Sequence, residues 1–246
     1  PESIKFQPVI LGRSAGRPTG IVGAVVTLMG LIAFNRQAFL DAQWYQQATP
    51  KPYAPALDAM GPALSGRLPV AFRAARAAEV FRALEMAKVF KLDPIITGAR
   101  QVEEVTAALK AANARVIYSL NFPTRRLSLA PDADESLSVL RDRANAPKGP
   151  ALLDQAGILF AFESNGLTEP KDFLKNAQKT VASGLSKDAA LKALTINAAS
   201  MAGAADRLGT LDLGKIANLV VTDGDLFDEK SAIRHVFVNG RMVKLN

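Results

Sequence analysis

Short runs of apolar residues alternate with amphipathic segments along most of the chain. A short apolar run is typical of a buried strand, and apolar positions three and four residues apart are typical of a helix with one buried face. Strands and helices in alternation indicate βα units that build a parallel sheet. The pattern predicts four strands, at residues 68–72, 94–97, 115–120 and 157–163, and helices at residues 74–90, 101–112, 135–144, 151–156, 170–183 and 186–197.

The pattern changes after Gly209. Asn239-Gly240 lies there between two apolar runs, and this dipeptide is a strong signal for a tight hairpin turn. We therefore expect a small antiparallel sheet at the C-terminal end, with strands at residues 217–222, 233–238 and 241–245.

The longest apolar stretch, residues 20–34, contains three glycines. It is shorter than the roughly 20 residues that a membrane-spanning helix needs. We predict instead a buried helix that continues through Phe39, Leu40 and Trp44, and no membrane partner.

The amino-acid composition excludes several kinds of catalytic and metal site. The chain has no cysteine and a single histidine, which excludes disulfides, CxxC zinc sites, thiol nucleophiles and multi-histidine metal centres within it. The 30 Lys and Arg residues exceed the 23 Asp and Glu residues, for a net charge of +7. Apart from two small groups the basic residues are scattered, so we predict no nucleic-acid partner; the groups are Arg73, Arg76 and Arg82, and Arg125 with Arg126.

Residues 190–228 and 233–243 carry a set of motifs that resembles the C-terminal signature of the amidohydrolase superfamily, in particular its imidazolonepropionase- and prolidase-like branch. The T-x-N-x-A motif of that family corresponds here to Thr195, Asn197 and Ala199. The L-G-x-L-x-x-G-K-x-A-D-L-V-V motif, with Asn218 in place of the Asp, corresponds to Leu208, Gly209, Gly214, Lys215, Ala217, Leu219 and Val220.

The resemblance implies the fold. Residues 68–99 look like the fifth strand, its helix and the sixth strand of a (β/α)8 barrel, and residues 157–166 look like the eighth strand. The expected fold class is α/β: a partial TIM-type (β/α)8 barrel of the amidohydrolase kind at residues 1–207, with C-terminal β-sandwich strands at residues 208–246. In the family an N-terminal region completes both parts, and this chain does not clearly supply strands one to four. Because open sheet edges favour pairing, we predict a partner polypeptide carrying the N-terminal half, or a homo-oligomer.

Catalysis in that family rests on one or two divalent metals, held by His and Asp side chains at the ends of the barrel strands. Such a metal lowers the pKa of a bound water towards 7, and the eighth-strand Asp takes its proton. Here the fifth-strand position falls near Phe72 or Arg73, the sixth-strand position near Thr97, and the eighth-strand position at Asn165. An amide is no base near neutral pH, and a guanidinium repels a divalent cation. We predict no metal on this chain alone. The resemblance allows zinc or another divalent metal in a complete assembly.

Polar residues at the predicted strand ends are the candidate site residues. Glu163 and Asn165 are the catalytic candidates, because strand alternation points both side chains to one side if the strand is regular that far. The alternative for Glu163 is an ion pair with Arg73 or Arg100. The candidates for binding a carboxylate-bearing substrate, for which a solvated or salt-bridged rim is the alternative, are Arg73, Thr97, Arg100 and Asn121.

Two other candidates have simpler interpretations. His235, the single histidine, lies in a strand of the antiparallel segment, and we assign it a structural role. Asp132, Asp134 and Glu135 lack the spacing of a calcium-binding loop, and we expect them to cap the following helix.

Two functions stay open at this point. The first is a portion of an amidohydrolase-like hydrolase that acts on a non-peptide C–N bond or a small peptide-like amide, and that is incomplete without the N-terminal metal-binding half. The second is a non-catalytic, metal-free relative that serves as a structural or ligand-binding subunit. The resemblance favours the first function, whereas Arg73 and Asn165 favour the second.

Overall fold

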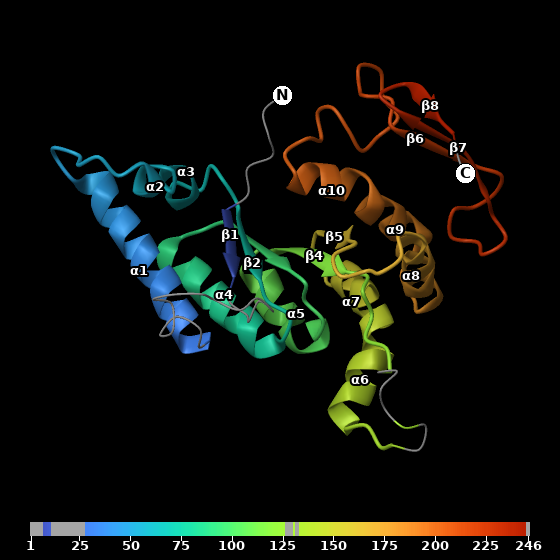
Figure 1. Cartoon of the computed structure of the whole chain (residues 1–246), viewed down its shortest axis with the longest axis horizontal. Helices are drawn as coiled ribbons and strands as arrows, with labels where there is room; N and C mark the ends of the chain where they lie inside the picture. The colour runs from blue at the N-terminus through green and yellow to red at the C-terminus, as the bar shows by residue number, and fades with distance from the viewer. Residues whose placement is uncertain (1–6, 11–27, 126–129, 131–132, 245–246) are drawn as a thin grey trace. The chain divides into compact units, whose positions relative to one another are not determined.

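The computed structural model describes residues 7–10, 28–125, 130 and 133–244 (Figure 1). The chain forms two compact units, Pro1–Ile117 (unit 1) and Tyr118–Asn246 (unit 2). The expected division after residue 207 stays a prediction.

Unit 1 is an α/β unit with a parallel sheet. Its strands follow the order β1-β2-β3-β4, and the pairings of β1 with β2, β2 with β3 and β3 with β4 are parallel. Figure 1 shows α4 and α5 side by side next to these strands. The elements of unit 1 are β1 (Gln7–Ile10), α1 (Leu28–Gln47), α2 (Pro55–Asp58), α3 (Gly61–Leu64), β2 (Val70–Arg73), α4 (Ala77–Phe90), β3 (Pro94–Thr97), α5 (Val102–Ala111) and β4 (Arg115–Ser119), the last of which continues into unit 2.

Strand β1 is an addition to the predicted set of strands. Its Gln7 lies in register with Val70 of β2, so a strand precedes the one that resembles the family's fifth. The expectation that the N-terminal part of this chain supplies no barrel strand is therefore wrong for β1.

The core of unit 1 lies between the sheet and its helices. Phe72 and Ile96 are in register on adjacent strands and fully buried. Val80 and Leu84 of α4 are buried as the helical spacing predicts, but Phe81, expected on the same face, is 47% exposed. A step of one residue turns a helical side chain by about 100°, which places Phe81 beyond the edge of the buried stripe.

Only part of helix α1 is buried against the rest of unit 1. Phe39 is buried and packs against Phe90 of α4, with the ring centroids 5.1 Å apart. Leu40 and Trp44, predicted to be buried, are 43% and 62% exposed. The two exposed residues share one side of the helix, and Phe39 and Tyr45 occupy another. In the described part of the chain, no helix is both long and apolar enough to cross a bilayer.

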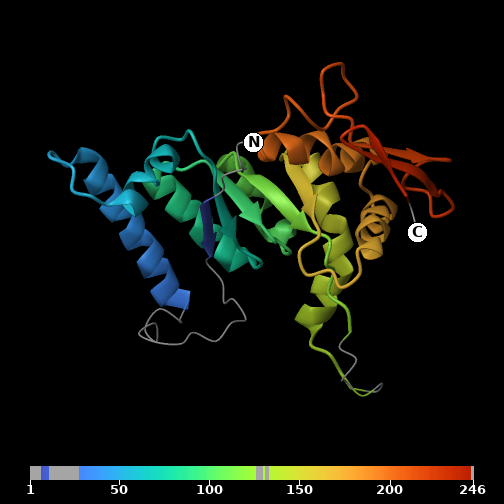
Figure 2. The same ribbon diagram turned by 45° about the horizontal axis from the view of Figure 1, so that its top comes forward.

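Unit 2 combines helices with a small antiparallel sheet, whose strands Figure 2 shows together in red. The predicted Asn239-Gly240 hairpin is confirmed, with both residues at positive φ, as a type I′ turn requires. The elements are α6 (Leu137–Asn145), the 3-10 helix η2 (Ala146–Lys148), α7 (Gly149–Gln155), β5 (Phe160–Glu163), α8 (Lys171–Ala182), α9 (Lys187–Leu194), α10 (Ile196–Met201), β6 (Leu219–Thr222), β7 (Ile233–Val238) and β8 (Arg241–Val243).

The signature residues of unit 2 have structural roles. Asn197 Nδ2 donates a hydrogen bond to the carbonyl oxygen of Phe160 in β5, at 2.9 Å. Lys215 Nζ donates to the carbonyl oxygen of Ala205, at 2.8 Å, and so closes the loop after α10. Gly209 has φ +96° and packs against the backbone of Ile196. These contacts join the last helix to β5 and to the loop that leads into the antiparallel sheet.

We expect Asn197→Ala to lower the free energy of unfolding by about 1–2 kcal/mol, because the carbonyl of Phe160 loses its side-chain donor. The matched control is Ser200→Ala, an exposed position on the same helix, where the expected change is within about 0.5 kcal/mol. Urea denaturation followed by circular dichroism measures both values. Equal effects in the two variants would contradict the role given to Asn197.

Candidate functional site

Two predicted site residues come together in unit 1. Arg73 ends β2, Thr97 ends β3, and the two residues lie in register. In-register residues of neighbouring strands point their side chains to the same face of the sheet. The Arg73 side chain is exposed and Thr97 is half-buried.

The loops after β2 and β3 bring Arg100 to the same edge. The backbone N–H of Ala74 donates to the carbonyl of Thr97, and that of Arg100 donates to the carbonyl of Ala75, both at 3.0 Å. Gln101 Oε1 accepts a hydrogen bond from the backbone N–H of Ala77 at 3.1 Å, at the start of α4. The two loops therefore lie against each other, and Arg100 is held beside the residues that follow Arg73.

The other three candidates come together in unit 2. The backbone N–H of Leu120 donates to the carbonyl of Glu163, at 3.1 Å, so the ends of β4 and β5 are adjacent. The Ser119 hydroxyl donates to the carbonyl of Asn165, at 3.4 Å, and also accepts from the backbone N–H of Asn121. Asn121 and Glu163 are half-buried, and Asn165 is exposed.

The sequence analysis placed Glu163 and Asn165 on one side only if the strand is regular as far as Asn165, and it is not. Strand β5 ends at Glu163, and Asn165 lies in a turn with Gly166, whose φ is +83°. A Cβ on Gly166 would lie 2.5 Å from Asn121 Nδ2, so the Asn121 amide packs tightly against this turn. Period-two alternation therefore does not apply to Asn165. An ion pair of Glu163 with Arg73 or Arg100 would join the two units and stays a prediction.

The sequence analysis missed two buried polar residues beside this group, Ser119 and Asn176. Asn176 of α8 is 8% exposed, and its Nδ2 donates to the carbonyl of Leu120 at 2.8 Å. Lys179 Nζ donates to Asn176 Oδ1 at 2.9 Å. Asn176 thus fixes the chain just before Asn121. The signal that would have found it is an asparagine next to the apolar positions of a predicted amphipathic helix.

In the acidic segment before α6, Glu135 pairs with two arginines. Glu135 accepts two hydrogen bonds from Arg143, at 2.9 and 2.6 Å, and lies 3.5 Å from Arg125 Nη1. The hydrogen bond from Arg143 to Glu135 raises the pKa of the Arg143 guanidinium. Arg125 Nη2 also donates to the carbonyls of Ala130 and Ala133. Glu135 therefore ties the loop to the helix; the expected capping role stays a prediction, and Asp132 lies outside the described residues.

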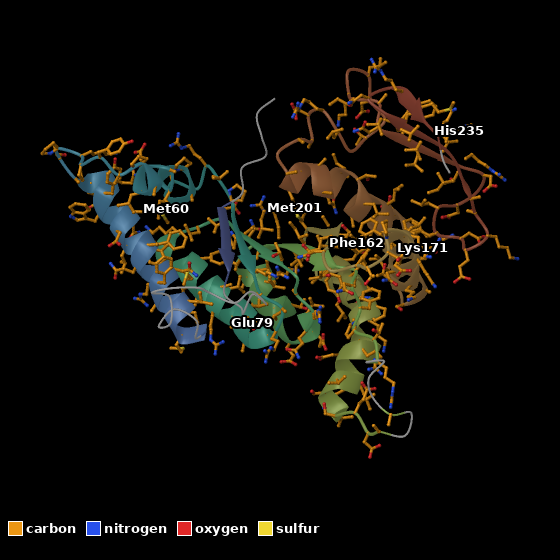
Figure 3. The ribbon with its side chains drawn as sticks, viewed as in Figure 1. Met60, Glu79, Phe162, Lys171, Met201 and His235 are labelled. Atoms are coloured by element: carbon orange, nitrogen blue, oxygen red, sulfur yellow. The ribbon has the colours of Figure 1, made fainter. Side chains whose placement is uncertain are left out.

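His235 lies in β7, where the sequence placed it (Figure 3). Its ring is 6.4 Å from that of Phe237, and it is exposed on the antiparallel sheet. It belongs to a different element from every candidate at the strand ends.

The strand ends do not fit a metal of the kind found in amidohydrolases. Among the residues that the structure describes, no three His, Cys, Asp or Glu side chains form a group that could hold a metal ion. In the sequence comparison the family's ligand positions fall near Phe72 or Arg73, near Thr97 and at Asn165, and this correspondence stays a prediction. A guanidinium carries donors only and a fixed positive charge, so it neither ligates nor attracts a divalent cation.

These features define an α/β protein with polar residues at the carboxyl ends of parallel strands, the usual place of a ligand site in such folds. Residues 98–243 match the amidohydrolase family, over more than half of the chain. The chain belongs to the amidohydrolase family. Among curated proteins, no match was found.

Solved structures share the fold at low sequence identity. An amidohydrolase from Thermotoga maritima has a TM-score of 0.73 and 23% identity, over 89% of this chain and 57% of that chain. A prolidase complexed with N-methylphosphonate-L-proline has a TM-score of 0.59 and 18% identity, over 98% and 68%. A Xaa-Pro dipeptidase with bound methionine has a TM-score of 0.51 and 18% identity, over 77% and 47%. The chain thus spans 57% of the length of the Thermotoga protein.

Proposed function

We propose that this chain is a portion of a hydrolase that acts on a non-peptide C–N bond or a small peptide-like amide. The observation that carries the proposal is the amidohydrolase-family match over residues 98–243, which includes β4, β5 and the signature contacts of Asn197, Gly209 and Lys215. Relatives of the same fold include a prolidase and a Xaa-Pro dipeptidase, which supports a small amide as the substrate class.

The chain would supply polar groups at the ends of its strands. In unit 2, backbone hydrogen bonds hold Asn121, Glu163 and Asn165 near the ends of β4 and β5, which supports the proposal that their side chains orient a substrate amide. The half-buried carboxylate of Glu163 is the one group of these three that can accept a proton. In unit 1, Arg73, Thr97 and Arg100 offer donors.

The metal of such a hydrolase would be held outside this chain. No step of the reaction is assigned to a metal on Arg73, Thr97 or Asn165, because those groups do not fit one. We propose that a polypeptide carrying the N-terminal half, or further copies of this chain, complete the assembly. The antiparallel sheet supports this proposal, since both of its faces expose apolar side chains: Val220, Val238 and Val243 on one face, and Val221, Ile233 and Met242 on the other.

Native mass spectrometry and size-exclusion chromatography test the assembly. We expect a species heavier than the 26.2 kDa of one chain, because the sheet edges and apolar faces favour association. A well-folded, monodisperse monomer of 26.2 kDa that stays soluble at high concentration would refute the proposal.

Hydrolysis of dipeptides and cyclic amides by the assembled protein, with and without a chelator, tests the reaction. We expect turnover that the chelator removes. Assembled protein that is folded, free of metal and inactive towards both substrate classes would instead identify the non-catalytic, ligand-binding relative.

A further inference from the structure

We propose that helix α1 pairs in parallel with α1 of a second copy of this chain. The contact surface is a row of exposed residues that we call the α1 stripe: Ala33, Gln37, Leu40 and Trp44. The inference goes beyond the proposed function, because two copies would pair in this way whether or not the chain takes part in hydrolysis.

Helix α1 has apolar residues on two opposite sides. On one side, Phe39 and Ala42 are buried against the rest of unit 1. Leu40 lies two residues before Ala42, a rotation of about 200° around the helix axis, so the α1 stripe faces away from unit 1. The large apolar side chains that α1 exposes are Met29 (69%), Phe34 (60%), Leu40 (43%) and Trp44 (62%). A helix with apolar residues on all sides is normally buried on all sides, so a partner for the stripe is expected.

The direction of the stripe favours a second copy over a strand and helix that extend the sheet. Strand β1 lies at the end of the sheet among the described strands, and α1 lies at one side of unit 1 (Figures 1 and 2). In α/β folds the helices form a layer on the sheet, so the helix of an added strand would lie beside α1 and cover its flank. The outer side of α1, which carries the stripe, would stay exposed.

The spacing of the stripe is that of a coiled-coil seam. Ala33, Gln37, Leu40 and Trp44 follow one another at steps of four, three and four residues. Core positions of a coiled coil alternate in this way, and in two parallel helices each core residue packs against its counterpart. Leu40 and Trp44 would then be covered in the pair. A polar residue at one core position, here Gln37, lowers the stability of a pair but fixes its register.

The residues that flank the stripe are complementary in the parallel orientation. In a parallel pair, the residue before one core position meets the residue five positions further along the other helix. Arg36 therefore meets Asp41 of the second copy, and Met29 meets Phe34, each twice by symmetry. Gln37 Nε2 donates a hydrogen bond to Asp41 Oδ1 at 2.7 Å, which holds the carboxylate beside the stripe.

The opposite orientation lacks this complementarity. In an antiparallel pair the same edge of each helix meets itself, so Arg36 would lie on the side of the other copy's Arg36, and Asp41 on the side of its Asp41. Flanking charges of opposite sign set the orientation of paired helices, and here they favour the parallel pair.

The size of the contact sets the expected affinity. Helix α1 has 20 residues and is therefore about 30 Å long. Stable interfaces bury roughly 1,200–2,000 Å² in total, and one helix from each copy reaches only the lower part of that range. We therefore expect a dimer that dissociates on dilution.

Dilution of the full chain, followed by sedimentation and by tryptophan fluorescence, tests the pairing. Trp44 is the single tryptophan, so its emission reports the cover of the stripe even if copies also associate elsewhere. We expect the emission to shift to longer wavelength as the dimer dissociates. Leu40→Glu, a change at a site exposed in the single chain, should raise the dimer Kd at least about tenfold, because it places a charge in the seam.

A charge exchange tests the flanking pair. Arg36→Glu and Asp41→Arg should each raise the dimer Kd by about threefold or more, and the double variant Arg36→Glu/Asp41→Arg should restore it. Arg82→Glu, at an exposed position of α4, is the matched control and should leave the Kd unchanged.

A single introduced cysteine tests the orientation, because the chain has none of its own. Oxidised Ala33→Cys should form a disulfide-linked dimer, since a parallel pair brings the two copies of residue 33 together, whereas an antiparallel pair sets residue 33 against residue 44. Three results would overturn the proposal: Trp44 emission that does not change with concentration, no restoration by the double variant, or no disulfide-linked dimer of Ala33→Cys.

Discussion

Gly209→Ala is expected to lower the free energy of unfolding by roughly 2–5 kcal/mol, the sum of a left-handed backbone penalty and an overpacking penalty. Gly209 has φ +96°, where a side chain is strained. A Cβ at this position would also lie 2.8 Å from the Cα of Ile196 and 3.0 Å from the Cβ of Ala199. Backbone atoms cannot move away as the end of a flexible side chain can, so α10 would have to shift from the loop. The midpoint of urea denaturation measures the effect.

Gly214→Ala is the matched control, because Gly214 has a similar φ of +87° but no atom within 4 Å of the position that a Cβ would take. Only the backbone penalty applies there, and we expect a loss of about 1–2 kcal/mol. Similar losses for the two variants would show that the close approach of Gly209 to Ile196 contributes nothing to stability.

The double variant Arg73→His/Thr97→His is expected to bind Zn²⁺ at least about tenfold more tightly than the parent chain. Removing a positive charge about 5 Å from a divalent ion is alone worth roughly 1.7 kcal/mol even at the dielectric constant of water. The two imidazoles would stand in register on adjacent strands and face the same side of the sheet, as two ligands of one ion must. Isothermal titration calorimetry with Zn²⁺ measures the change.

Arg73→Gln is the control for that experiment, since it removes the charge without adding a ligand. We expect the double variant to bind Zn²⁺ more tightly than Arg73→Gln does. Equal affinities would mean that the side chains at positions 73 and 97 do not converge on one ion.

Much of the fold could be predicted from the sequence where a local signal marks the end of an element. The bounds of β3 and β7 match the prediction, because Pro94 breaks the preceding helix and Asn239-Gly240 forces a turn after β7. Strand β1 was not predicted. It has only four residues and is separated from the next strand by α1, so the alternation of strands and helices along the sequence does not mark it. Leu40 and Trp44 show a second limit of prediction from sequence. An apolar pattern indicates which residues prefer burial, but it does not indicate how much surface the neighbouring elements can cover.

The candidate site was predicted as a set of residues at strand ends, and the structure divides that set between two units. The neighbouring positions of Arg73 and Thr97 could be predicted, because they follow from strand register and the sequence pattern indicates that register. The position of Asn165 could not be predicted in this way, because β5 ends two residues before it and Asn165 lies in the turn with Gly166. Glu135 binds Arg143 and Arg125, and Asn176 binds the carbonyl of Leu120. Such partners depend on tertiary packing and lie beyond local spacing.

The metal content of the purified wild-type chain, measured by inductively coupled plasma mass spectrometry, tests the central claim most directly: the family's metal is not held by this chain. We expect well below one equivalent of zinc or any other divalent metal per 26.2 kDa chain after dialysis, because Arg73 and Thr97 occupy the strand ends. One equivalent that survives dialysis and is removed by a chelator would contradict the claim.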